Sequence, residues 1–548
     1  MNGYLLALAV IGVYLVILLA GRWSKLWKRI GVSLYGPIMF FRTKRGLETI
    51  ARAGSRRRFW RAYGGLCIGV ILLSMVLIVL FLFWETYGVL TAPTSPDADG
   101  IRLGPLSIDT VVLGYYLVFG LVVSVLVHEF AHGALASAEK IRLDAVGLLL
   151  LIVPLGAFVE LNDDDLKKAK RTSRLGVYAT GPATNMFAAA ICLAVLVWGL
   201  GPAIDPISPG ALVTDIARDS PAEIFGLPAW SEITEVDGAP MDDSSEFYNF
   251  EFDEPGEPVW LTYLHKGDEL HISVPAGVTI TQVHPGPAYN DGLKPGMIIA
   301  SLNGTVIRSE SQFRSVTENS SYKEPIEITV LTYGYDPDRG IDWFLEDPTI
   351  AYINLTSKWL YYYKYYPSLN KQEYENISVM GVSTAPLGVT TEDINYLPRL
   401  VSHPFTGDDG DGRIVRSILR FIALPTLGYS PVVSPATDLY QPSGAFSSVP
   451  TDIFWVLVNA VYWLFWTNLL VGLANALPAI PFDGGYALRD LLKETAHRSG
   501  DRLTGFEKTI GRRPIADWQI DHLMWVVTAL VLLVVIFLVT WPIIDPII

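Results

Sequence analysis

Residues 111–132 have the sequence VVLGYYLVFGLVVSVLVHEFAH, an apolar run that ends in the motif His128-Glu129-Phe130-Ala131-His132. About 20 apolar residues cross a hydrocarbon core of roughly 30 Å, so this run predicts a membrane-spanning helix. Positions i and i+4 share one face of a helix, and His128 and His132 can therefore hold one zinc ion. Glu129 follows the first histidine directly and is near enough to activate a metal-bound water.

The alternative interpretation of this motif is a polar helix end at the membrane interface, with Gly133 and Ala134 following it. Two histidines and a glutamate are costly within a transmembrane helix, and such residues are functional by default. We therefore favour a catalytic metal site at this position.

Five further apolar runs are long enough to span, so six spans are expected in total. They occupy residues 3–20, 64–84, 175–204, 453–482 and 523–544. The first run is expected to be an uncleaved helix, because no basic segment precedes it and no small-residue cleavage site follows it. The composition agrees with this count, since 51% of the 548 residues are hydrophobic, only 18% are charged, and the mean hydropathy is +0.34.

The same composition excludes several classes of protein. Apolar and aromatic residues are too abundant for a disordered chain. Two cysteines, Cys67 and Cys192, exclude a disulfide scaffold and a cysteine-based zinc module. The net charge of −14 argues against a general nucleic-acid binder, and no nucleic-acid partner is expected.

The distribution of charge predicts the orientation in the membrane. Residues 22–63 contain twelve lysines and arginines against Glu48 alone, so the positive-inside rule places this loop in the cytoplasm. Alternation through the spans then places residues 205–450 outside. Within that segment, residues 201–410 contain 32 acidic and 11 basic residues, a net charge of −21.

A third zinc ligand is predicted in the segment Asn475-Ala-Leu-Pro-Ala-Ile-Pro-Phe-Asp483-Gly-Gly485. A catalytic zinc usually takes three protein ligands and leaves a fourth position for water. By the predicted topology, Asp483 reaches the same cytoplasmic membrane depth as the histidine pair. An ordinary helix-capping aspartate is the alternative, but an unpaired carboxylate within the membrane is costly.

The external segment contains an imperfect internal repeat. Residues 219–238 align with residues 284–304, and each copy contains Pro-Ala, then Gly-Leu, then a tight Asp-Gly or Asn-Gly turn. The second copy resembles a PDZ domain closely and the first more loosely. In PDZ domains an extended peptide or a C-terminus adds as a strand to a sheet edge. Two small β-rich domains with generic turns are the alternative.

Residues 143–161 (LDAVGLLLLIVPLGAFVEL) are apolar but interrupted by Gly147, Pro154 and Gly156. The segment is too broken for a spanning helix, and it fits a re-entrant or interfacial hairpin covered by protein or by a water-filled cavity. A short interfacial helix is the alternative.

With these motifs in place, the chain resembles the site-2 proteases, a family of intramembrane zinc metalloproteases, and is closest to prokaryotic, archaeal members. Three motifs carry the resemblance: HExxH at 128–132, Gly-Pro-Ala-Thr-Asn at 181–185, and Asn-x-Leu-Pro…Asp-Gly-Gly at 475–485. The resemblance implies that Glu129 is the general base and that Asn185 and Asn475 support the substrate or the transition state. It also implies that the 143–161 hairpin pairs with an extended substrate.

The expected fold is a polytopic α-helical membrane protein with an inserted, extracytoplasmic tandem PDZ-like α+β region. The expected divisions follow in chain order. They are the first helix with its basic loop (1–63), the first part of the membrane core (64–204), two PDZ-like domains (205–275 and 276–390), an extracytoplasmic linker (391–450) and the second part of the membrane core (451–548).

The expected function is cleavage of transmembrane helices of other membrane proteins in the cell membrane, using one Zn²⁺ on the cytoplasmic side. A non-catalytic, membrane-anchored PDZ adaptor is one alternative, and a membrane metalloprotease that cleaves outside the bilayer is another. Substrate identity and oligomeric state are not predicted.

Overall fold

The computed structural model describes residues 12–14, 16–21, 27, 32–35, 38–91, 111–151, 153–322, 324–336, 341–365, 371–404, 436–501 and 516–544. Within these residues five helices are long and apolar enough to cross a membrane. They are α4 (Arg57–Thr91), α5 (Val111–Ala138), α7 (Arg171–Val195), α15 (Thr451–Ala476) and α18 (Asp517–Ile544). Of the sixth expected span, at residues 3–20, only 12–14 and 16–20 are described, and they are helical.

Small residues let α5 approach α15 closely. A Cβ atom added at Gly120 would lie 2.9 Å from the Trp463 carbonyl oxygen and 2.7 Å from Thr467 Oγ1. The Ser124 and Thr467 hydroxyls lie 2.9 Å apart and form a buried hydrogen bond between the same helices. This contact joins the middle of α15 to α5, and α15 is followed by α16 (Asp483–Asp501).

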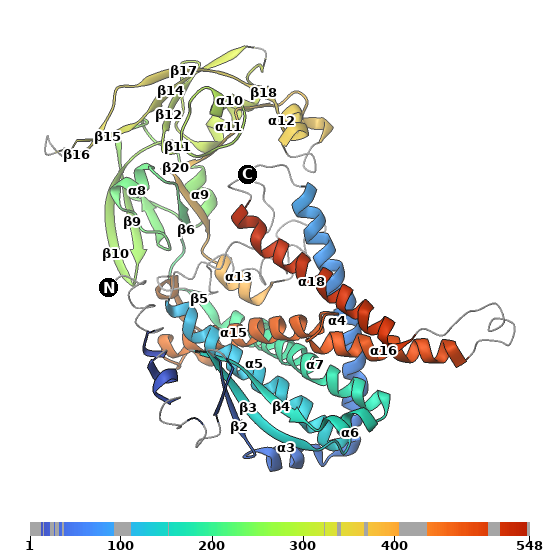
Figure 1. Ribbon diagram of the computed structural model, residues 1–548. Coiled ribbons are helices and arrows are strands. Elements are labelled where there is room, and N and C mark those ends of the chain that lie inside the picture. The colour runs from blue at the N-terminus through green and yellow to red at the C-terminus, as the bar shows by residue number, and fades with distance from the viewer. Residues whose placement is uncertain are drawn as a thin grey trace, which may run out of the picture.

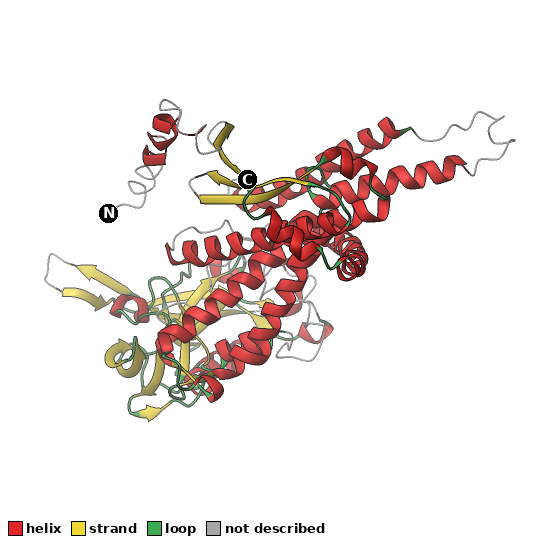
Figure 2. Cartoon of the chain, turned by 90° about the horizontal axis from the view of Figure 1, so that it is seen from below, coloured by secondary structure: helices red, strands yellow, loops and turns green. Residues whose placement is uncertain are grey.

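A four-stranded antiparallel sheet lies beside the helices, at the end of the molecule that also holds α3 (Leu47–Gly54) (Figure 1). Its order is β1 (Val32–Tyr35), β2 (Ile38–Thr43), β3 (Leu143–Leu151) and β4 (Val153–Leu161). The 143–161 segment is thus a β-hairpin and not a helix. Figure 2 shows the helices between this sheet and the larger strand-rich region.

The sequence did not predict the first two strands, which lie in the basic loop. Strand β2 pairs with β3, placing Phe40 opposite Leu149. The surrounding arginines conceal this short apolar stretch in the sequence, and its partner strand is more than 100 residues away.

Residues 204–393 form two β-domains. The proximal β-domain has the sheet order β10-β9-β7-β6-β21, and the distal β-domain has the order β17-β14-β12-β11-β20. Each has its own apolar core. The proximal strands are β6 (Ala211–Ile216), β7 (Glu232–Val236), β8 (Ala239–Pro240), β9 (Pro258–His265), β10 (Asp268–Pro275) and β21 (Val389–Asp393). The distal strands are β11 (Val278–Val283), β12 (Ile298–Leu302), β13 (Thr305–Val306), β14 (Pro325–Leu331), β17 (Thr349–Asn354) and β20 (Val382–Pro386).

Short helices and paired strands complete this region. The helices are α8 (Pro221–Phe225), α9 (Ser244–Tyr248), α10 (Pro287–Asn290), α11 (Glu310–Asn319), α12 (Lys358–Tyr365) and α13 (Tyr396–Ser402). The additional strands are β15 (Tyr333–Asp336), β16 (Ile341–Leu345), β18 (Thr356–Ser357), β19 (Ser378–Val379), β5 (Ile204–Pro206) and β22 (Tyr440–Pro442). Helix α6 (Asp163–Lys168) joins β4 to α7.

The two β-domains are nested and not consecutive. Strand β21 follows the distal domain but pairs with β6 of the proximal domain. Leu387 and Gly388 both adopt positive φ, so the chain turns sharply from one sheet into the other. A five-residue strand is too short to assign from periodicity, and the sequence instead predicted a linker from residue 391.

The proximal β-domain packs onto the helical region through one continuous apolar core. Leu212 of β6 and Leu397 of α13 belong to the same buried cluster as Tyr440 and as Phe454 of α15. The β-domains are therefore joined to the helices by packing as well as by chain connections.

Candidate metal centre

Three side chains from two distant segments meet inside the helical region. His128 and His132 lie on α5, and Asp483 is the first residue of α16. Asp483 Oδ2 lies 3.1 Å from the Nε2 atom of each histidine, and the two Nε2 atoms are 3.1 Å apart. Both histidines are buried. The three atoms form a nearly equilateral triangle with one carboxylate oxygen and two imidazole nitrogens.

This triangle fits a tetrahedral metal ion. Ligands at about 2.0–2.1 Å from a tetrahedral zinc ion lie roughly 3.4 Å apart, close to the observed separations. Gly181 of α7 provides the necessary room, because a Cβ atom there would lie 2.3 Å from His132 Nε2 and 2.8 Å from His128 Nε2. The residues present therefore fit a zinc ion.

Hydrogen bonds to groups outside this triangle orient both imidazoles. His132 Nδ1 lies 2.6 Å from the Val177 carbonyl oxygen, so this nitrogen donates its proton and leaves Nε2 with a lone pair. His128 Nδ1 lies 3.2 Å from the Asn185 side-chain amide. Asn185 Oδ1 has no hydrogen-bond partner among the described residues. Turning the amide so that Oδ1 accepts from His128 Nδ1 satisfies both groups and leaves His128 Nε2 free for a metal.

Glu129 accepts a hydrogen bond from outside its own helix. The Val159 backbone N–H on β4 donates to Glu129 Oε2 at 2.8 Å. Strand β4 is an edge strand of its sheet. Because the Val159 N–H donates to Glu129, it points away from β3. The carboxylate is therefore held at the edge of β4 that has no strand partner among the described residues.

Asp483 reaches the histidines because the chain between α15 and α16 is tightly folded. A Cβ atom at Gly484 would lie 2.4 Å from the Ala476 carbonyl oxygen, and one at Gly485 would lie 2.5 Å from Ala479. The Ile480 backbone N–H also donates to Thr528 Oγ1 of α18 at 2.9 Å. The two glycines thus allow α16 to begin directly against the end of α15.

Comparison with known proteins identifies the family. The sequence profile of Peptidase family M50 matches residues 116–506, which include His128, His132 and Asp483. The chain belongs to peptidase family M50, the site-2 protease family. This family consists of membrane zinc metalloproteases, in agreement with the donor set and with the multi-pass helical fold.

Two relatives match parts of this M50 protein. An uncharacterized protein of Methanocaldococcus jannaschii is 30% identical over 159 residues, which are 29% of this chain and 42% of the relative. A protein of Hahella chejuensis, described as a probable periplasmic serine endoprotease, DegP-like, is 24% identical over 170 residues. The second match covers 23% of this chain and 36% of the relative, so the chain spans less than half of either protein's length.

Asn475 lies on α15, near its end. Its side-chain Nδ2 donates to the Val471 carbonyl oxygen of its own helix at 3.0 Å. In the hairpin, Gly147 is required by close packing, because a Cβ atom there would lie 2.2 Å from the Phe41 carbonyl oxygen. Pro154 and Gly156 lie on β4, where Pro154 pairs with Leu150 and Gly156 with Leu149.

The sequence did not identify three groups that complete this site: Gly181, the Val177 carbonyl and the Val159 N–H. Gly181 lies in the recognised 181–185 motif, so the motif was a signal for it. The two backbone groups have no signal in the sequence, because any residue type supplies them.

Proposed function

We propose that this M50 protein is an intramembrane zinc metalloendopeptidase that cleaves transmembrane segments of other membrane proteins. The observation that carries the proposal is the meeting of His128 and His132, on the apolar helix α5, with Asp483 at the start of α16, although Asp483 is 351 residues beyond His132 in the chain. Histidine 128 lies ten residues before the end of α5, about 15 Å along the helix. A site at that depth suits a substrate that is itself within the membrane.

The chain's own groups have distinct parts in the reaction. His128, His132 and Asp483 would hold a zinc ion, which when bound polarises water and lowers its pKa toward about 7. Glu129 would accept a proton from the attacking water and return it to the leaving amine. Val177 and Asn185 would keep both imidazoles in the tautomer that hydrolysis requires.

The free edge of β4 would bind the substrate. A helical peptide bond is shielded by its neighbouring turns, so a transmembrane substrate must unwind locally before cleavage. Its exposed backbone groups then need partners, because unpaired N–H and C=O groups are costly in the membrane. Strand β4 offers such partners directly beside Glu129.

The orientation and the role of the β-domains belong to the same proposal. The basic loop at residues 22–63 supports a cytoplasmic location for the metal centre and an extracytoplasmic location for the acidic β-domains. The sheets and the partial match to the DegP-like relative support PDZ-like domains. They would admit substrates by size, or bind a peptide or C-terminus at a sheet edge.

The test uses purified full-length protein in nanodiscs with zinc and a model single-span substrate. Glu129→Gln is expected to keep stoichiometric zinc and to lose cleavage by about a hundredfold or more, the usual contribution of a general base. Mass spectrometry of the products is expected to place the cut within the apolar segment.

Three results would contradict the proposal. Cleavage by Glu129→Gln at the wild-type rate would exclude this mechanism. Cuts only outside the apolar segment would indicate a protease that acts outside the bilayer. Absence of zinc from both the wild type and His128→Ala would favour the non-catalytic adaptor.

A further inference from the structure

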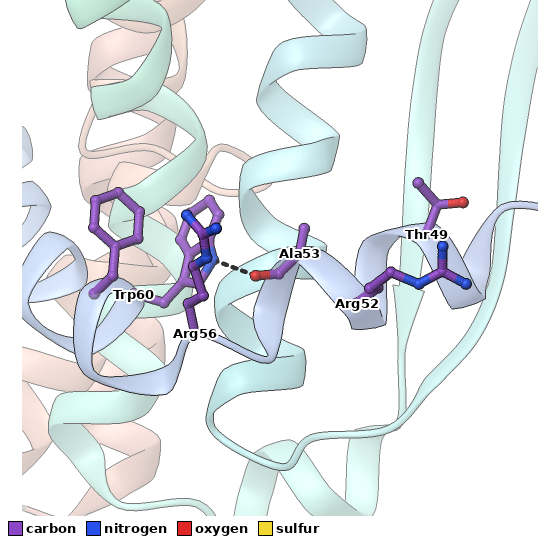
Figure 3. A pocket seen from close by; sticks show the side chains of 6 residues that line it. Thr49, Arg52, Ala53, Arg56 and Trp60 are labelled. Carbon is purple, nitrogen blue, oxygen red and sulfur yellow. Dashed lines mark hydrogen bonds between the residues drawn. The ribbon is translucent and has the colours of Figure 1, made fainter.

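A hollow outside the metal centre lies where α3 turns into α4. Its volume is about 430 Å³, and it is lined by Thr49, Arg52, Ala53, Arg56, Phe59 and Trp60. Figure 3 shows Arg52 and Arg56 on either side of Ala53, whose carbonyl oxygen accepts a hydrogen bond of 2.9 Å from Trp60 Nε1. This bond fixes the turn between the two helices and therefore the shape of the hollow.

The two arginines of the hollow lack acidic partners. Arg42 pairs with Glu160, and Arg61 pairs with Glu139 at 2.8 Å. Neither Arg52 nor Arg56 forms an ion pair within the part of the chain that the structure describes, and both are exposed. Arg52 and Arg56 both line the hollow, and arginine pairs well with phosphate because its N–H groups form a planar fork.

An apolar stripe leads away from the hollow along α4. Phe59, Leu66 and Leu73 are each seven residues apart, and their exposed fractions are 58%, 57% and 61%. Seven residues are nearly two helical turns, so the three side chains lie on one face. Because α4 is a membrane-spanning helix, this face lies along the hydrocarbon region and begins at the hollow.

The hollow is also joined to the metal-binding helix. Helix α3 packs on α5 just beyond His132: a Cβ atom at Gly133 would lie 2.8 Å from Ile50. On the α3 side, a Cβ atom at Gly54 would lie 2.5 Å from the Ala134 carbonyl oxygen. The position of α3 therefore constrains the turn of α5 that follows the metal ligands.

We propose that this hollow binds the phosphate of an anionic phospholipid, with Arg52 and Arg56 on the phosphate and an acyl chain along Phe59, Leu66 and Leu73. The two lining arginines favour a phosphate, and the apolar stripe favours a lipid over a free phosphate. The positively charged choline of a zwitterionic lipid would be repelled by the same arginines. A bound lipid would hold α3 against α5 and so support cleavage, a consequence that rests on the proposed protease function.

The test compares full-length protein in nanodiscs of phosphatidylcholine with and without a minor fraction of phosphatidylglycerol. Native mass spectrometry of released protein is expected to show phosphatidylglycerol retained by the wild type. In Arg52→Gln/Arg56→Gln this retention is expected to fall by about tenfold or more. The control, Arg57→Gln/Arg58→Gln, removes the same charge from neighbouring exposed arginines outside the hollow and is expected to retain the lipid.

Equal loss in both double variants would show a general charge effect and overturn the site. Displacement of phosphatidylglycerol by inorganic phosphate, in the arm that contains this lipid, would show that the hollow selects free phosphate and not lipid. Zinc content and folding are measured in parallel, so a failure of the protease function does not alter the lipid result. If the lipid binds but cleavage is the same with and without phosphatidylglycerol, the proposed support of α5 is wrong.

Discussion

Gly181 determines whether His128, His132 and a metal ion can occupy the same space. The nearest atoms to its missing side chain all belong to these two rings: Nε2 and Cδ2 of His132 and Nε2 of His128. These ring positions are fixed by Val177 and Asn185, so the rings cannot turn away without losing hydrogen bonds. A single methyl group at residue 181 would therefore displace the ligand set.

We predict that Gly181→Ala lowers zinc affinity by at least about tenfold, a loss typical of disturbed metal shells, and abolishes cleavage. Metal analysis after dialysis against a weak chelator measures the loss. Gly65→Ala is the matched control, because an added Cβ atom at this helical glycine meets no atom within 4 Å. Full zinc occupancy in Gly181→Ala would show that the ligands do not lie as described.

At the scale of the element, β4 has one edge bound to β3 and one edge free. The Val159 N–H points to the free edge and donates to Glu129. The N–H groups of successive residues point alternately to the two edges of a strand, so the Ala157 N–H points to the same edge as the Val159 N–H. It is therefore a backbone donor on β4, two residues from Val159, that a substrate strand would find beside Glu129.

We predict that Ala157→Pro reduces cleavage of a transmembrane substrate by about tenfold while zinc binding is unchanged. Proline removes this N–H but is tolerated on an edge strand, and the preceding Gly156 lessens the steric conflict with the ring. Ala157→Val keeps the N–H and is expected to cleave normally. Wild-type rates in Ala157→Pro would mean that the substrate does not pair with this edge.

At the scale of the whole molecule, Glu232 lies where the proximal β-domain meets the helical region. The carboxylate is fully buried and accepts a hydrogen bond of 2.8 Å from Ser208, while Oε1 has no partner among the described residues. Burial raises the pKa of Glu232 to about 7, and the Ser208 hydrogen bond opposes that rise. Tyr440, whose pKa is raised by burial and by the Glu232 charge, faces it from β22.

The folded state thus holds the Glu232 proton more tightly than the unfolded state. Stability of the proximal β-domain is expected to fall as the pH rises from the ordinary glutamate pKa to about 7, by about 3 kcal/mol. Hydrogen exchange of the full-length protein at about pH 5 and about pH 8 measures this change. Glu232→Gln should flatten the dependence, whereas Glu235→Gln, an exposed acid on the same strand, should not.

The parts of the fold that the sequence predicted are those specified by local composition. An apolar helix containing HExxH and a glycine-flanked Asp483 are visible in short windows, because membrane burial makes polar residues there exceptional. Strands β2 and β21 were missed because each depends on a partner more than 100 residues away, at Leu149 and Ile216. Asn475 was placed by resemblance alone, and its observed hydrogen bond is within α15.

The nested β-domains set an order of events during biosynthesis. The ribosome completes β10 at Pro275 but makes the last proximal strand only from Val389 onward. The distal domain is contained entirely between these points, so it can fold while the proximal sheet still lacks its edge strand. On the growing chain, the inserted domain matures first and the domain that encloses it closes afterwards, just before the last spans are made.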